Sequence, residues 1–236
     1  MIADARSHSG QSPMLVRQAI LQDAASIAEL IAAAFRDDPI LRWLIPDARW
    51  RHGIVADYFR SAVRHLYLPH EQVYLTEDVS GAALCLPAGV TVGSPPLLDE
   101  LGLAWRLCTA CGLGGLLRAH TLQATVHASR PAEPHFYVHA LGVRPSQQGR
   151  GVGSALLRQV TGHCDRCKFR AYLENTNERN LPLYERYGFR VLGTWHASNG
   201  GPTIWFMARD YRHATESMSA QRSFAADEAV ANNCEH

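Results

Sequence analysis

The segment HFYVHALGVRPSQQGRGVGSALLRQVTGH, residues 135–163, decides the fold of this chain. Residues 135–143 have the aromatic and β-branched side chains of a strand, and residues 154–163 are typical of a helix. The loop between them contains QQGRGVGS, residues 147–154, with three alternate glycines around Arg150. Glycines allow positive φ angles and have no side chain to block a ligand. A strand, a glycine loop and a helix in this order form an anion site from backbone N–H groups.

The ligand of this loop is narrowed by what the loop lacks. A P-loop needs a lysine directly after its last glycine, but Ser154 follows Gly153 here. A dinucleotide fingerprint needs a third glycine, which neither Ser154 nor Leu156 supplies. Glu174 ends the next expected strand, so the acidic residue of a dinucleotide site is present. Spacing alone therefore leaves a phosphate nest of undetermined ligand, or a plain glycine-rich turn.

Regular elements extend on both sides of this segment. We expect strands at 14–20, 72–78, 81–89, 135–143, 169–174, 189–197 and 202–210, and helices at 23–35, 39–46, 54–68, 154–163 and 181–188. The CGLGG run at 111–115 should separate two further helices. Because helices and strands alternate up to a closing antiparallel pair, the pattern predicts a single α/β domain with a mixed sheet.

The ends of the chain differ from its middle. Residues 1–13 and 213–236 have few large apolar side chains and no periodic face, so we expect two flexible tails around one domain at 14–212. The formal net charge is only +1, which gives no electrostatic reason for nucleic acid or an anionic membrane as partner. The N-terminus has no apolar signal core, and no apolar run is long enough to span a bilayer. These features predict a cytoplasmic protein.

Two C-x-x-C pairs, Cys108/Cys111 and Cys164/Cys167, raise the alternative of a zinc site. The first pair lies in a leucine-rich helical stretch, where cysteine behaves as a small apolar residue. The second lies where a helix should end, without the usual knuckle glycines. We therefore expect no metal and interpret these thiols as packed or incidental.

Two further blocks identify a family resemblance. Gln148-x-x-Gly151-x-Gly153, directly after LGVRP, resembles the acyl-CoA pyrophosphate loop of the GNAT superfamily of N-acetyltransferases. Residues 171–189, AYLENTNERNLPLYERYGF, resemble its later strand–helix block, which ends Tyr-x-x-x-Gly-Phe. The resemblance covers roughly residues 14–211 and is greatest to the puromycin N-acetyltransferase group. It implies a GNAT-type domain whose mixed central sheet has a splayed strand pair and is flanked by helices.

The resemblance implies that the chain binds acetyl-CoA and releases coenzyme A. The strand end Leu141, Gly142 and Val143 should pair with the pantetheine arm, and the Leu141 N–H should meet the thioester oxygen. Asn180 is expected to cap the following helix and to contact the cofactor. The residues expected to hold the pyrophosphate are Gln148, Gly149, Arg150, Gly151, Val152, Gly153 and Ser154.

Tyr184 matches the family tyrosine placed near the CoA sulfur, so the resemblance assigns it as the general acid. The base is open between His139, whose ordinary pKa of about 6.5 suits the task, and Glu174 on the adjacent strand. Tyr187 is expected only to pack.

An acceptor pocket is expected in the N-terminal half. Phe35, Asp37, Asp38, Trp43 and Tyr58 combine acidic and aromatic side chains, which suits a cationic amine. The predicted activity is acetyl transfer to the primary amine of a small molecule, by direct attack in a ternary complex. A protein or peptide acetyltransferase and a non-catalytic acyl-CoA-binding module remain alternatives, and the chain is expected to be a monomer or a homodimer.

Overall fold

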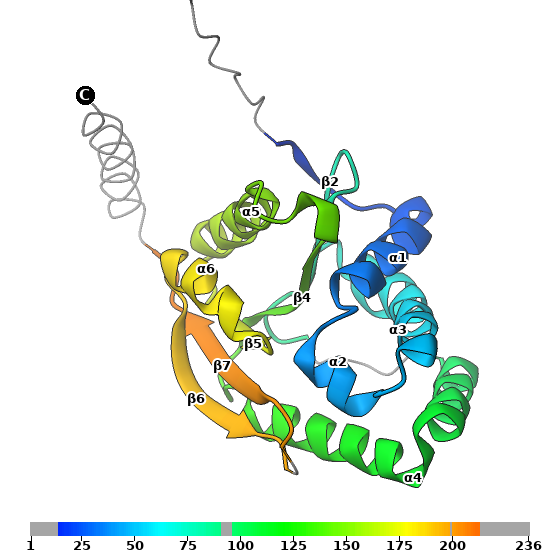
Figure 1. Ribbon diagram of the computed structural model, residues 1–236. Coiled ribbons are helices and arrows are strands. Elements are labelled where there is room, and N and C mark those ends of the chain that lie inside the picture. The colour runs from blue at the N-terminus through cyan, green and yellow to red at the C-terminus, as the bar shows by residue number, and fades with distance from the viewer. Residues whose placement is uncertain (1–13, 91–95, 199, 213–236) are drawn as a thin grey trace, which may run out of the picture.

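A computed structural model describes residues 14–90, 96–198 and 200–212; the predicted tails at 1–13 and 213–236 lie outside them. Seven strands form one sheet in the order β1-β2-β3-β4-β5-β7-β6 (Figure 1). All neighbouring pairs are antiparallel except β4 and β5, which are parallel. The strands are β1 (Val16–Gln18), β2 (Val73–Thr76), β3 (Gly81–Leu86), β4 (Phe136–Val143), β5 (Ala171–Asn175), β6 (Arg190–His196) and β7 (Thr203–Arg209).

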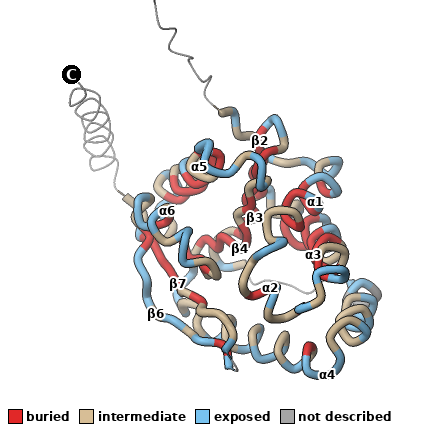
Figure 2. The backbone as a smooth tube through the Cα atoms, viewed as in Figure 1, coloured by how far each residue is buried: buried red, intermediate tan, exposed pale blue. Residues whose placement is uncertain are grey.

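Helices cover both faces of the sheet and divide the interior into two hydrophobic cores (Figures 1 and 2). Side chains alternate along each strand: Tyr137 of β4 packs in the first core, and its neighbours Phe136 and Val138 pack in the second. Helix α1 meets β4 and α3 in the first core, and α5 packs on β2, β3 and β4 in the second. The helices are α1 (Ala24–Ala34), α2 (Pro39–Leu44), α3 (Ala48–Ala62), α4 (Leu97–Ser129), α5 (Val152–Cys167) and α6 (Leu181–Arg186).

Strands β4 and β5 are paired only at their beginnings. The register runs from Phe136↔Ala171 to Val138↔Leu173 and stops there, although β4 continues to Val143. Because no strand of the described residues pairs with the far end of β4 on that side, the sheet opens into a wedge. This confirms the predicted mixed sheet with a splayed strand pair.

A β-bulge lies where the two strands part. Leu84 of β3 pairs with Ala140 and the next residue, Cys85, pairs with Val138, so His139 is the extra residue on β4. A bulge shifts the alternation of side chains by one position. Tyr137 and Ala140 therefore both pack in the first core, while Val138 and Leu141 pack in the second.

Helix α4 is bent at Gly112, whose φ of 63° and ψ of −171° are not helical. This confirms the expected break within 111–115. The helix contacts α3 and α2, and it runs along one end of the domain to the hairpin of β6 and β7 (Figure 1).

In the described part of the chain, no helix is long and apolar enough to cross a membrane. Within the same residues, no three His, Cys, Asp or Glu side chains are grouped to hold a metal ion. The two C-x-x-C pairs lie on different helices, α4 and α5.

Candidate active site

The glycine loop after β4 has the conformation of an anion nest. Gly149 and Gly151 have φ angles of 75° and 81°, and a Cβ atom at either position would meet nothing within 4 Å. Helix α5 begins after Gly151, and the first backbone bond into it runs from the Ala155 N–H to the Gly151 carbonyl at 2.9 Å. The N–H groups of the three preceding residues, 152–154, thus have no partner within the helix. They form the positive end of the helix, on the wall of the cleft.

Gly153, Gln148 and Arg150 have different surroundings from those two glycines. A Cβ on Gly153 would lie 3.4 Å from Leu183 of α6, so this glycine keeps α5 close to α6. The Gln148 amide donates to the Val143 carbonyl at 3.3 Å, which fixes the loop against the end of β4. The Arg150 side chain is exposed and, among the described residues, forms no ion pair; it donates to the Gln147 side-chain carbonyl at 3.4 Å, so its charge is available to a ligand.

The bulge sets which backbone groups of β4 face the wedge. The Phe136 N–H points toward β5, since it donates to the Arg170 carbonyl at 2.7 Å. The Arg144 N–H points the other way and donates to the Ser80 carbonyl at 2.8 Å. Alternation back from Arg144 turns the Leu141 and Val143 N–H groups toward the wedge, where no strand is paired. Leu141, Gly142 and Val143 all line the cleft.

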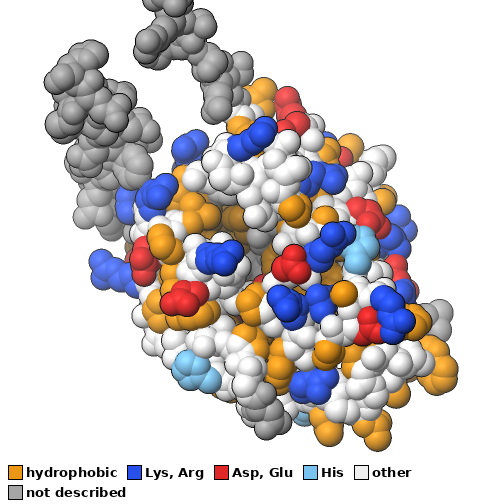
Figure 3. Space-filling view, in the orientation of Figure 1, with side chains coloured by type: hydrophobic (Ala, Val, Ile, Leu, Met, Phe, Trp, Pro, Cys, Tyr) orange, Lys and Arg blue, Asp and Glu red, His pale blue; other side chains and the backbone are white. Residues whose placement is uncertain are grey.

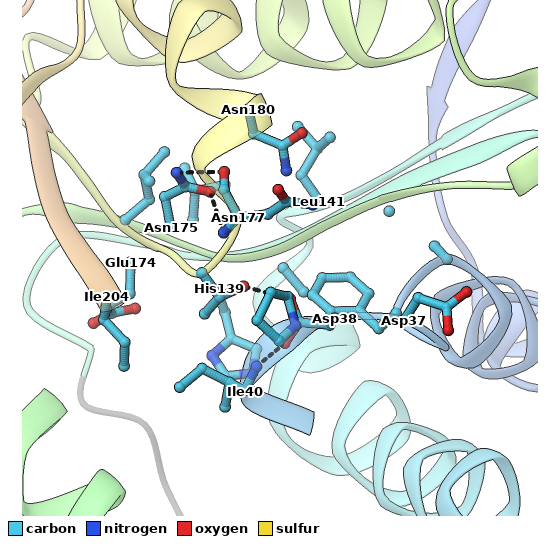
Figure 4. A pocket seen from close by; sticks show the side chains of 18 of the residues that line it. Asp37, Asp38, Ile40, His139, Leu141, Glu174, Asn175, Asn177, Asn180 and Ile204 are labelled. Carbon is cyan, nitrogen blue, oxygen red and sulfur yellow. Dashed lines mark hydrogen bonds between the residues drawn. The ribbon is translucent and has the colours of Figure 1, made fainter. Parts of the chain in front are cut away.

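The end of β5 and the segment after it carry three asparagines with distinct surroundings (Figure 4). Asn175 and Asn177 hold the turn: the Asn175 amide donates to the Asn177 carbonyl at 2.9 Å, and the Asn177 side chain accepts the Arg179 N–H at 3.1 Å. Asn180 occupies the N-cap position of α6 but makes no side-chain capping bond. The expected capping role of Asn180 is therefore wrong, and its side chain extends into the cleft instead.

Tyr184 of α6 is buried and lines the cleft opposite β4. Its ring packs edge-on against Phe189 at 6.0 Å, and its hydroxyl makes no hydrogen bond to the described residues. Burial, with a smaller contribution from Asp38, raises the pKa of Tyr184 to about 12. The phenol is thus protonated at neutral pH and can donate a proton in the cleft. Tyr187, in contrast, donates to the Ser154 carbonyl at 2.9 Å and ties α6 to the start of α5.

The two candidate bases, His139 and Glu174, are joined through a residue that sequence analysis did not single out. The Tyr137 hydroxyl donates to Glu174 Oε2 at 2.7 Å and lies 3.0 Å from His139 Nδ1. The hydroxyl has one hydrogen, which it gives to the carboxylate, so Nδ1–H donates to Tyr137 and Nε2 remains for the cleft. Tyr137 lies two residues before His139, and this period-2 spacing on a strand is the signal that could have found it.

Arg130, at the end of α4, is the second residue that sequence analysis missed. Its guanidinium lies over the Tyr137 ring at 4.3 Å, and its Nε is 3.5 Å from Glu174 Oε1. Burial raises the pKa of Glu174, while the Tyr137 hydrogen bond and Arg130 oppose that rise. Burial and Arg130 lower the pKa of His139 to about 4, so this imidazole is neutral at pH 7.

The predicted acceptor residues are separated by the structure. Phe35, Asp37 and Tyr58 line the cleft. Asp38 lines it too, but its Oδ1 caps α2 by accepting the N–H groups of residues 40 and 41 at 2.9 and 3.1 Å. Its Oδ2 accepts the Thr176 hydroxyl, so both of its oxygens are engaged within the protein.

Trp43 is not among the residues that line the cleft. It packs edge-on against Trp195 of β6 at 6.3 Å, and the Arg118 guanidinium of α4 lies 5.7 Å from its ring centre. This contact fastens α2 to the β6–β7 hairpin and to α4. Trp43 therefore supports α2, which lines the cleft, from outside the cleft.

Together these elements enclose one cleft of about 1940 Å³, hollowed into the face seen in Figure 3. The glycine loop, the end of β4 and α6 form one part of its wall. The other part consists of α2, residues from both halves of α4 and Ile204 of β7. His139 and Glu174 lie between the two parts, as Figure 4 shows.

Comparison with known proteins agrees with this geometry. Residues 98–189, which include β4, the glycine loop and α6, match the Acetyltransferase (GNAT) family model. Over these residues the chain is similar to the GNAT family of acetyltransferases. The fold of the described residues is the GNAT fold. The finer resemblance to the puromycin N-acetyltransferase group stays a prediction.

Three similar proteins extend this comparison. A mycothiol acetyltransferase of Propionibacterium freudenreichii is 29% identical over 63% of this chain and 46% of its own length. The chain thus spans less than half of that relative. An uncharacterized N-acetyltransferase of Schizosaccharomyces pombe is 24% identical over 75% of this chain and 74% of its own. A crystal structure from Corynebacterium glutamicum, described as histone acetyltransferase HPA2 and related acetyltransferase, has a TM-score of 0.66 at 22% identity, covering 86% of this chain and 99% of that one.

Proposed function

We propose that this protein is an acetyl-CoA-dependent N-acetyltransferase that acetylates the primary amine of a small molecule, an antibiotic or an aminonucleoside among the candidates. The observation that carries the proposal is the wedge between β4 and β5. There, an unpaired strand edge, a phosphate nest and a protonated phenol face one cleft.

The residues around the wedge fit acetyl-CoA. The nest at 149–154 offers backbone N–H groups and the Arg150 charge to a pyrophosphate. The unpaired edge at Leu141–Val143 offers N–H and carbonyl groups to an extended, amide-containing chain, as a neighbouring strand would. Asn180 projects from the opposite wall. In acetyl-CoA a nucleotide with its pyrophosphate is attached to an extended pantetheine arm. These groups follow one another in the same order as the nest and the strand edge along the cleft.

Acetyl transfer needs a positioned oxyanion donor and an acid. The Leu141 N–H is aimed at the wedge and stabilises the thioester oxygen as it gains charge during attack by the amine. Tyr184 donates its proton toward the departing thiolate, for which its raised pKa keeps it in the acid form. His139 lines the same cleft, and its Nε2 accepts the proton of the amine.

Helix α4 favours a small acceptor over an extended peptide. Its contacts with α2, the Trp43–Trp195 packing and the Arg130–Glu174 ion pair bound the part of the cleft beyond His139. A peptide lying across the face would have to displace this wall. Apolar residues of α4 such as Leu103, Leu107 and Val126 line the wall, among polar ones.

Thiol release from acetyl-CoA, measured over a panel of alkylamines, aromatic amines, aminosugars, aminonucleosides and short peptides, tests this function. Amine-dependent release, with the N-acetyl product identified by mass spectrometry, supports it. Tight coenzyme A binding by calorimetry without turnover would make the chain a binding module. Turnover with peptides alone would replace the small-molecule acceptor.

A further inference from the structure

We propose that His139, Tyr137 and Glu174 form a proton relay that carries the acceptor's proton from the cleft to the buried Glu174 carboxylate. The inference rests on the proposed function, whose site it deepens. His139 is the catalytic base that meets the amine, and Tyr137 and Glu174 act through it. His139 and Glu174 are thus parts of one connected unit and not two alternative bases.

The hydrogen bonds run in one direction along the relay. His139 Nδ1–H donates to the Tyr137 hydroxyl at 3.0 Å, and that hydroxyl donates to Glu174 Oε2 at 2.7 Å. Two structural features bring these groups together. The bulge at His139 ends the β4–β5 pairing beside Glu174, and Tyr137 lies two residues earlier on the same face.

The proton balance closes without another reactant. As the amine attacks, its N–H proton moves to His139 Nε2. The Nδ1 proton moves to the Tyr137 oxygen, and the Tyr137 hydroxyl proton moves to Glu174 Oε2. The imidazole ends neutral as the other tautomer, the phenol is regenerated, and the carboxylate becomes a neutral acid.

The surroundings of His139 explain why a relay is needed. The ring is stacked on Tyr67 at 5.3 Å and lies 6.2 Å from Phe59, while the Arg130 cation faces the same cluster. Two other titratable groups lie near this cluster: Tyr58 of α3 lines the same cleft, and Tyr172 of β5 stacks on Tyr137 at 6.1 Å.

These neighbours make an imidazolium unfavourable and lower the pKa of His139 to about 4, so alone it is a weak base at pH 7. Burial raises the pKa of Glu174, so protonation of this carboxylate is favoured. Passing the charge change to Glu174 therefore avoids accumulation of an imidazolium in a dry site.

Two variants break the relay while keeping His139 and nearly the same side-chain shape at the changed position. Tyr137→Phe removes the bridging hydroxyl, and Glu174→Gln removes the proton acceptor. We expect kcat for acetyl transfer to fall by about 100-fold in each, within the range of general-base catalysis. The KM for acetyl-CoA should stay within about twofold, because neither residue touches the nest. Tyr67→Phe is the matched control, since it keeps the stacked ring and is expected to keep kcat.

A second readout does not depend on finding an acceptor. Nitrogen-15 NMR of the histidines should show His139 as the Nδ1–H tautomer at pH 7, titrating near pH 4, and Tyr137→Phe should convert it to a tautomer mixture. If Tyr137→Phe keeps the kcat, the pH–rate profile and the His139 tautomer of the wild-type protein, the relay is overturned and the proposed function still stands. Absence of transfer to any amine, with the tautomer change observed, would instead refute the function.

Discussion

Tyr184→Phe removes a single oxygen atom and should lower catalysis while leaving folding nearly unchanged. The Tyr184 hydroxyl makes no hydrogen bond to the described residues, and the ring stays packed against Phe189 in the variant. The free energy of unfolding should therefore change by less than about 1 kcal/mol, the usual contribution of one hydrogen bond. Affinity for coenzyme A should also be unchanged, because the nest lies on a different element.

The loss should appear in the rate. A positioned general acid contributes about 10²–10⁴-fold, or roughly 2.7–5.5 kcal/mol of barrier at about 1.4 kcal/mol per tenfold. The phenol is active in its protonated form, so kcat should fall when Tyr184 loses its proton at high pH. Because the pKa of Tyr184 is raised to about 12, this fall moves up from the ordinary value of about 10. The wild-type kcat should thus show no loss of this acid between pH 7 and 10.

The assay is thiol release from acetyl-CoA under saturating acceptor, with thermal unfolding measured in parallel. Tyr187→Phe is the matched control on the same helix. It removes the 2.9 Å bond to the Ser154 carbonyl, so it should lower stability by about 1 kcal/mol and the melting temperature by about 2–4 °C while keeping most of kcat. The two variants should therefore show opposite patterns.

Two results would refute this reasoning. If Tyr184→Phe retains kcat within about twofold, the phenol is not the acid. If wild-type kcat falls with a midpoint near pH 10, the site does not raise the pKa as its burial requires.

Two further perturbations test the nest and the support beneath it. Gly151→Ala should weaken coenzyme A binding about tenfold, because φ is 81° and a left-handed non-glycine residue costs about 1–2 kcal/mol, and Gly151→Asp should weaken it more by placing a carboxylate against the pyrophosphate. Calorimetry checks this against Gly89→Ala, which has the same strain at φ 83° outside the cleft; equal losses of affinity would exclude the nest. Arg209→Met should cost about 3–5 kcal/mol in urea unfolding, because the buried guanidinium makes two 2.8 Å bonds to Asp165. Arg49→Met, at an 85% exposed side chain, should leave the urea midpoint nearly unchanged, and similar losses in both variants would contradict the role of burial.

The local sequence determined the cofactor side of the site. A glycine at each left-handed position, a helix directly after the loop and alternating strand patterns are short-range properties, which residues 135–163 specify within one segment. The expected strand–loop–helix unit and the break within 111–115 are therefore found in the structure, and so is the splayed pair, which the family resemblance implied. The family blocks narrowed the phosphate ligand, because spacing alone could not.

Tertiary structure decided the acceptor side. Asp38 faces the cleft, yet it is used as a helix cap because Thr176 and α2 meet there, a contact between residues far apart in the chain. Trp43 packs behind the cleft for a similar reason, its partner Trp195 being on β6. Residue type indicates what a side chain can bind. It does not show whether another part of the protein already occupies that side chain in the folded state.

The proposed relay shows most clearly which features depend on the local sequence and which depend on the tertiary structure. Tyr137 and His139 are two residues apart, so strand periodicity already places them on one face. Their connection to Glu174 depends on a parallel neighbour, on a bulge that adds one residue, and on Arg130 arriving from the end of α4. Register and bulge position are set by packing across the whole sheet. The sequence therefore indicated both candidate bases, His139 and Glu174, and only the fold shows that they are connected.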